Sequence, residues 1–215
     1  HRRGDPGVAR GRRMEAVLAE HLVRGALELR AEQVGEGDRA AAGLDDRADV
    51  ADPKVRFVHA VPAGPNVTLQ RDGVAETGAT DVAYKYGSQY YDVSTRDYTF
   101  TLRTSSGNVE LASRALNADR GNKYTLVALP TDSGVELLPI RDPYNKSLTS
   151  DDARVRVLNA AVNAEPFDVY ITAVGADLAA ATPRMAALGY KQVAPASGED
   201  SVEIAPGAYQ LRLTP

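Results

Sequence analysis

The feature that most limits what this chain can fold into is an internal repeat. Residues 54–64 read KVRFVHAVPAG, and residues 153–164 read ARVRVLNAAVNA. Two further matches follow in the same order: DVYI at 168–171 matches NVTL at 66–69, and IAPGAYQLRL at 204–213 matches VSTRDYTFTL at 93–102. An ordered repeat of this length predicts two copies of one structural unit.

The repeated segments have the period of β-strands. Alternate residues of VRFVHA place Val55, Phe57 and His59 on one face, and DYTFTLRT does the same with Tyr98 and Phe100. Turn signals such as Asp-Gly at 72–73, SSGN at 105–108 and TDSG at 131–134 separate the short strands. This spacing favours an all-β fold, an antiparallel sandwich or barrel.

The first 53 residues differ in composition from the rest. They contain no Ser, Thr, Asn, Lys, Ile, Phe or Tyr, whereas all ten tyrosines follow later. Apolar residues at helical spacing predict one helix over Met14–Gln33, followed by a linker. We expect a helical and linker segment that makes few contacts with the β-region. Two origins stay open: a tail that precedes the folded domains, or translated GC-rich DNA upstream of the gene.

The two copies are expected to differ in length. In the first copy, at residues 54–148, the strand DYTFTLRT is followed by three more: VELASRA, KYTLVAL and VELLPI. The second copy, at 153–215, reaches only the equivalent of DYTFTLRT. We therefore expect a second domain that is incomplete at its C-terminus, in a chain cut from a longer one. Unpaired strand edges of that kind favour self-association.

These residues carry a family resemblance. The pattern VRFVHAVPAGPNVTLQRDG, a later Tyr86-Gly87, the strand DYTFTLR and the segment GNKYTLVAL resemble the DUF4397 family, a domain of unknown function common in exported and cell-surface bacterial proteins, often in tandem. The resemblance implies tandem immunoglobulin-like sandwiches and an extracellular or cell-surface location. It brings no catalytic residues. The second copy departs from the pattern, with Asn159 for His59 and Val162 for Pro62.

Composition argues against several classes of function. The net charge of -4 gives no basic footprint for nucleic acid. The absence of cysteine removes disulfides, thiolate nucleophiles and zinc–thiolate sites. The sequence contains no apolar run of about 18 residues, so no transmembrane segment is expected.

Candidate catalytic and metal-binding residues are few. His59 is the one histidine of the β-region, and its counterpart is Asn159, so we interpret it as a structural residue that hydrogen-bonds near a strand end. The acidic pair Asp151-Asp152 offers oxygen ligands that suit calcium, but no spaced Asp-x-Asp loop accompanies it. We therefore predict no catalytic residue, no metal and no cofactor.

A cluster of tyrosines between Tyr84 and Tyr98 is the candidate binding surface. Tyr84, Tyr86, Tyr90 and Tyr91 could contact carbohydrate or protein at the cell surface, because tyrosine offers a large contact area with a polar tip. The alternative is that they pack the sandwich. Tyr90 and Tyr91 are adjacent, so on a regular strand they face opposite sides.

The favoured function is a non-enzymatic, exported or cell-surface β-sandwich module that acts as a spacer or presents a surface. A carbohydrate- or protein-binding module that uses the tyrosine cluster is the alternative. A hydrolase is the least favoured reading, because no nucleophile, base and orienting group can be assembled.

Overall fold

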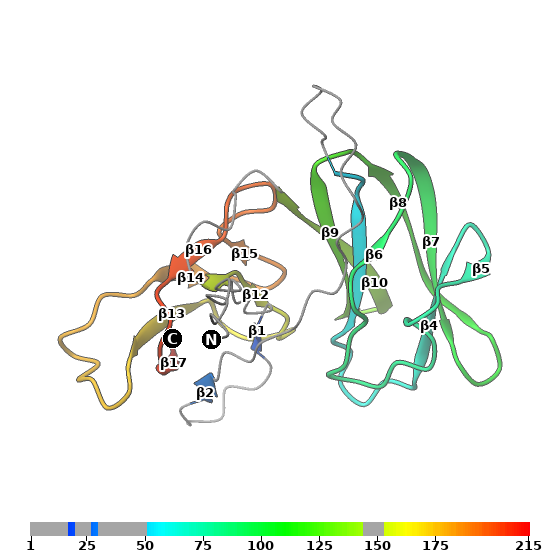
Figure 1. The fold of residues 1–215 in the computed structure, drawn as a ribbon. Coiled ribbons are helices and arrows are strands. Elements are labelled where there is room, and N and C mark those ends of the chain that lie inside the picture. Colours follow the sequence, from blue (N-terminus) through cyan, green and yellow to red (C-terminus); the bar gives the residue numbers. More distant parts are fainter. Residues whose placement is uncertain (1–16, 20–26, 30–50, 144–152) are drawn as a thin grey trace, which may run out of the picture.

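The described part of the chain consists of strands, turns and irregular segments. The structure is a computed structural model that describes residues 17–19, 27–29, 51–143 and 153–215 (Figure 1). No helix occurs among these residues, and so none that could cross a membrane. Two bodies are visible: residues 51–143, here named the N-unit, and residues 153–215, here named the C-unit.

The N-unit contains two four-stranded sheets. One has the order β10-β9-β3-β6 and the other the order β5-β4-β7-β8. Neighbouring strands are antiparallel except for β3 and β9, which run parallel. The strands are β3 (Lys54–His59), β4 (Val67–Arg71), β5 (Val74–Ala75), β6 (Tyr91–Asp92), β7 (Arg96–Thr104), β8 (Glu110–Ala118), β9 (Asn122–Thr131) and β10 (Gly134–Pro143).

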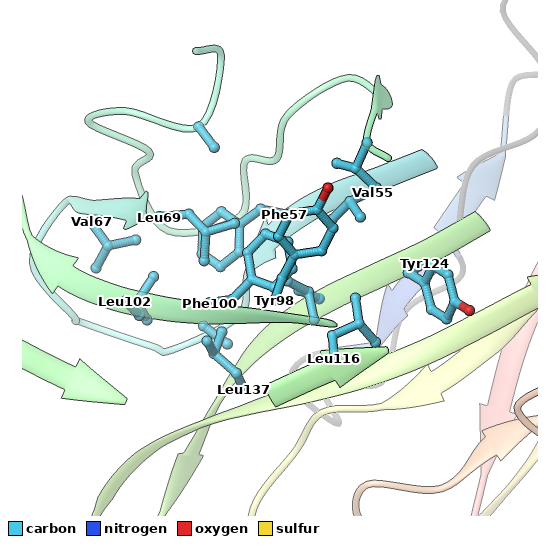
Figure 2. Packing of buried hydrophobic residues seen from close by; sticks show 14 of the residues in the cluster. Val55, Phe57, Val67, Leu69, Tyr98, Phe100, Leu102, Leu116, Tyr124 and Leu137 are labelled. Carbon is cyan, nitrogen blue, oxygen red and sulfur yellow. The ribbon is translucent and has the colours of Figure 1, made fainter. Parts of the chain in front are cut away.

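The two sheets of the N-unit bury one core between them, as in a β-sandwich. Phe57 from β3, Leu69 from β4 and Phe100 from β7 are fully buried and belong to one cluster (Figure 2). Leu126 from β9 is a fully buried member of the same cluster. Burial alternates along β7, from Tyr98 through Leu102, which confirms the period-two pattern read from the sequence.

The turn between β4 and β5 shows why the predicted hairpin forms. Asp72 and Gly73 have φ angles of 49° and 84°. Glycine reaches this left-handed region without strain, and Asp tolerates it, so Asp-Gly suits the primed turns that join twisted strands.

The C-unit has its own core and three sheets, of four, three and two strands. The sheet orders are β14-β13-β17-β2, β11-β16 and β1-β12-β15. Buried residues that include Val155, Phe167, Val169 and Leu211 form the core. The strands are β1 (Val17–Ala19), β2 (Leu27–Leu29), β11 (Ala153–Val155), β12 (Val157–Asn159), β13 (Phe167–Ala173), β14 (Met185–Leu188), β15 (Val193–Ala194), β16 (Val202–Ile204) and β17 (Tyr209–Thr214).

The helix expected over Met14–Gln33 is not confirmed. The two parts of it that the structure describes, β1 and β2, are strands, and its other residues lie outside the described part of the chain. β1 pairs with β12 and β2 pairs with β17, so for these strands the expectation of few contacts with the β-region is wrong. Hydrogen bonding to sheet edges outweighs a helix propensity that Gly25 already lowers by roughly 1 kcal/mol.

A third apolar cluster joins the two units. Val127 and Leu129 of β9 and Ile140 of β10 pack with Leu158 and Ala160 of the C-unit. These N-unit side chains point away from the N-unit core, because alternate residues of a strand face opposite sides of its sheet. The C-unit therefore covers the part of the outer face of the β10-β9-β3-β6 sheet that these apolar residues form.

Polar contacts reinforce this joint along β10. Arg141 accepts a hydrogen bond at its carbonyl oxygen from the Gly198 amide at 2.8 Å, and its own amide donates to Ser197 Oγ at 2.9 Å. Lys191 Nζ lies 2.7 Å from Glu136 Oε1. The edge of β10 is thus paired with a loop of the C-unit instead of lying open.

Replacing Phe100 by alanine is expected to lower the free energy of unfolding by about 3–5 kcal/mol, because the change leaves a cavity in the N-unit core. The neighbouring exposed Thr99 is the matched control, and Thr99→Ala should change this free energy by less than about 0.5 kcal/mol. Denaturant titration measures both. Equal losses for the two variants would contradict the assigned core.

Candidate functional site around His59 and the tyrosine segment

His59 ends strand β3 and is buried, with both ring nitrogens engaged. Nε2 lies 3.0 Å from the carbonyl oxygen of Pro65, and Nδ1 lies 3.2 Å from the amide nitrogen of Val61. The Val61 amide can only donate, so Nδ1 accepts and Nε2 carries the proton that it donates to Pro65. Burial lowers the pKa of His59 more than the bond to Pro65 raises it. The ring is therefore a neutral structural element that closes the loop after β3.

Asn159 occupies the equivalent position at the end of β12 and also accepts from the amide two residues further on, while its donated bond goes to β14. Its Oδ1 accepts from the Ala161 amide at 3.0 Å, and its Nδ2 donates to the Leu188 carbonyl at 2.9 Å. A carboxamide offers one acceptor and a donor group, as a neutral imidazole offers one of each. The His-to-Asn difference between the two sequence segments therefore preserves the hydrogen-bonding role.

Tyr84 and Tyr86 flank the backbone that pairs with His59. The Tyr84 ring is half-buried and meets the His59 ring edge-on, with centroids 6.3 Å apart, while Lys85 Nζ lies 5.1 Å from the Tyr84 centroid. The Tyr86 carbonyl accepts from the His59 amide at 2.9 Å, whereas its side chain is 70% exposed. Tyr86 is thus an exposed aromatic ring on a hydrogen-bonded segment.

Tyr90 lies between two cationic side chains. Its ring centroid is 4.7 Å from the Arg56 guanidinium carbon and 5.2 Å from Lys123 Nζ. Its hydroxyl lies 3.2 Å from Thr125 Oγ1, which also accepts from Arg56 Nε at 2.9 Å. Arg56 and Lys123 are both buried, so this ring shields two charges and is not an open binding surface.

Tyr91 faces the opposite side and packs against the N-unit core. Its hydroxyl is buried and has no hydrogen-bond partner among the described residues. Burial, and secondarily the charge of Glu76, raises the pKa of Tyr91 far above its usual range. Glu76 itself is buried and pairs with Arg71 at 2.5 Å; burial raises the pKa of its carboxyl more than Arg71 lowers it.

The four tyrosines of the predicted binding cluster therefore do not form one patch. Tyr90 and Tyr91 face opposite sides, as their adjacency requires, and both are partly buried. Tyr86 is the strongly exposed member, and Tyr84 is half-buried beside it.

Arg156 is a structural residue that the sequence analysis did not single out. This side chain is 5% exposed, and its Nε donates to Asp142 Oδ1 of β10 at 2.8 Å. Its terminal nitrogens donate to the carbonyl oxygens of Pro195, Ala196 and Glu199. Arg156 thus fixes the 195–199 loop of the C-unit against the last strand of the N-unit. A strand-alternating Arg at equivalent places in both segments, Arg56 and Arg156, was the available signal.

Acidic and histidine side chains do not gather into a metal site in the described part of the chain. The Asp151-Asp152 pair lies outside the described residues. His59 has both nitrogens bonded to its own loop, so in this conformation it offers no free nitrogen to a metal or a substrate.

The fold and these contacts define an all-β protein whose buried polar side chains close loops and join units. The sequence model of the family described as domain of unknown function (DUF4397) matches residues 53–170, more than half of the chain. The chain belongs to this family. Comparison with curated proteins finds no match.

His59→Ala is expected to lower the free energy of unfolding by about 1–3 kcal/mol, because the Val61 amide and the Pro65 carbonyl lose their partner. His59→Asn keeps an acceptor for the Val61 amide, as Asn159 does for Ala161, and should cost less. Thermal unfolding of both variants measures the difference. A His59→Asn variant as unstable as His59→Ala would contradict the assigned role.

The same variants test the pH dependence. Since the pKa of folded His59 is lowered, the unfolded chain binds more protons below about pH 6.5, and stability falls as the pH drops through that value. The wild type should therefore lose stability relative to His59→Asn between pH 7 and pH 5.

Proposed function

We propose that this chain is a non-enzymatic, exported or cell-surface module made of tandem immunoglobulin-like β-sandwich units that spaces or presents a surface. The observation that carries the proposal is the joint between the units. An apolar cluster, the ion pair between buried Arg156 and half-buried Asp142, and hydrogen bonds along β10 together hold the C-unit against the N-unit. A spacer needs such a joint, because a freely jointed pair of domains does not hold a fixed length.

Matching contacts support the tandem repeat. Tyr98 Oη donates to the Ser94 carbonyl at 3.0 Å, and Tyr209 Oη donates to the Ala205 carbonyl at 2.9 Å, four residues upstream in each case. The tyrosine corners of immunoglobulin-like sandwiches are also tyrosine hydroxyls bonded to backbone a few residues upstream.

Ion pairs match in the same way. Lys54 is the Cα partner of Asp92, and their side chains approach to 3.2 Å; Arg154 is the partner of Glu203, with an approach of 3.4 Å. Each pair links the first strand of its unit to an equivalent edge strand. Export and surface location are proposed on the resemblance that the first segment carries.

The joint is tested by the spread of distances between the units. The chain has no cysteine, so Ser106→Cys in the N-unit and Ala180→Cys in the C-unit, both at exposed positions, accept spin labels selectively. The labelled parent should give one narrow distance distribution by pulsed electron paramagnetic resonance. Arg156→Met removes the ion pair and should broaden it, whereas Arg184→Met, at an exposed arginine, should not. A broad distribution in the parent would argue against a stiff spacer.

The second candidate function is binding of carbohydrate or protein through Tyr86. The observation that favours it is an exposed ring whose backbone is held by hydrogen bonds to Ala83 and His59, so little ordering of the backbone is needed on binding. Tyr86→Ala should lower the signal on a panel of immobilised glycans at least tenfold. Val174→Ala, at an exposed apolar residue of the C-unit, is the control and should leave it unchanged. An unchanged signal for Tyr86→Ala would remove this candidate.

A further inference from the structure

Two strands from the first 53 residues lie beside strands of the C-unit in the same way as β9 and β8 lie beside strands of the N-unit. In the N-unit, β9 runs parallel beside β3, and β8 runs antiparallel beside β7. In the C-unit, β1 runs parallel beside β12, and β2 runs antiparallel beside β17. β12 and β17 are the strands that match β3 and β7 in the repeat, so both the positions and the directions agree.

The residues brought into register agree as well. Ala19 is the Cα partner of Asn159, and Ala128 is the partner of the equivalent His59. Leu29 is the partner of Tyr209, and Leu116 is the partner of the equivalent Tyr98. An alanine and a leucine thus stand at the same two register positions in both units.

The remaining partners in β1 are apolar in both units. Val17 is opposite Val157 in the C-unit, and at the same register position in the N-unit Leu126 is opposite Phe57. Leu18 is opposite Leu158, where Val127 is opposite Val58. In the N-unit, Leu116, Leu126 and Ala128 fill the core and Val127 fills the joint, so the apolar character of these positions has a structural reason.

We propose that the C-unit is a strand acceptor and that residues 17–19 and 27–29 of the same chain are its donor strands. The donor supplies β1 to the edge of β12 and β2 to the edge of β17, in the places that β9 and β8 take in the N-unit. Without the donor, both edges would expose unpaired amides and carbonyls, which is the surface that strand addition recognises. The equivalence of the two units rests on the tandem repeat of the proposed function, but the donor role is tested separately from the stiffness of the joint.

A disulfide tests the position of β2 and identifies which chain supplies it. Glu28 and Gln210 are Cα partners, and partners in an antiparallel pair lie within the Cα separation that a disulfide spans. Glu28→Cys with Gln210→Cys should oxidise to a disulfide within one chain, since the protein has no other cysteine. Glu28→Cys with Thr214→Cys is the matched control, because Thr214 lies four residues, about 13 Å, further along β17.

Gel electrophoresis without reductant separates the outcomes. A fast-migrating monomer that forms at least tenfold faster than in the control supports the donor in its own chain. A disulfide-linked dimer would overturn the proposal in favour of strand exchange with a second copy. A rate equal to that of the control would overturn the pairing itself.

Amide hydrogen exchange tests the position of β1. The Asn159 amide donates to the Gln192 carbonyl and the His59 amide to the Tyr86 carbonyl, both on the side away from β1 and β9. Successive amides of a strand point to opposite sides, so the Leu158 amide faces β1 and the Val58 amide faces β9.

The variant for this measurement is the full chain with Val17→Gly, Leu18→Ser and Ala19→Gly. The Leu158 amide should exchange at least tenfold faster than in the wild type, while the Val58 amide, the internal control, keeps its rate. Unchanged exchange at Leu158 would overturn the donor role of β1. Because Val58 reports on the N-unit in the same sample, a general loss of stability is recognised as a change at both amides.

Discussion

The outer face of the β10-β9-β3-β6 sheet is the surface on which the arrangement of the molecule depends. The inner face packs against the second sheet, as in any sandwich, but Val127, Leu129 and Ile140 point outward. Apolar side chains on both faces require two covering layers. The C-unit supplies part of the second layer with Leu158 and Ala160. The apolar residues of this face are therefore buried by the same contacts that attach the C-unit to the N-unit.

Buried polar groups serve the same architecture. Arg156 donates hydrogen bonds to three carbonyl oxygens of the 195–199 loop and to the Asp142 carboxylate. Its buried charge therefore has hydrogen-bond partners within the joint. Removing one member of such a set costs far more than the pair contributes in an exposed position, because the others stay buried without partners. His59 closes its own loop, and Asn159 links the end of β12 to the end of β14. The strongest polar interactions of the described residues thus hold loops and units in place.

Strand pairing sets a second condition. The N-unit supplies β8 and β9 from the chain that follows β7. In the C-unit, one neighbour of β12, which is β1, and one neighbour of β17, which is β2, come from residues that precede the N-unit. A chain segment can take such a position whenever its register presents apolar residues to the core and its backbone completes the ladder. Ala19 and Ala128 occupy the same register position in the two units, and so do Leu29 and Leu116. Two strands of three residues each are enough to reproduce these positions.

The sequence by itself determined the strands and their inward faces. The shared inward face of Val55 and Phe57, and that of Tyr98 and Phe100, could be predicted because a side-chain period of two is a local property. The Asp72-Gly73 turn could be predicted because its residues tolerate positive φ. His59 as a structural residue near a strand end could also be predicted from its replacement by Asn159. Tertiary structure decided the rest. It placed the Tyr90 ring between Arg56 and Lys123, placed Arg156 on Asp142, and made strands of residues 17–19 and 27–29 where helical spacing predicts a helix. Each of these depends on partners far away in the chain. A local sequence pattern cannot predict which distant strand edge or charged side chain a residue will contact.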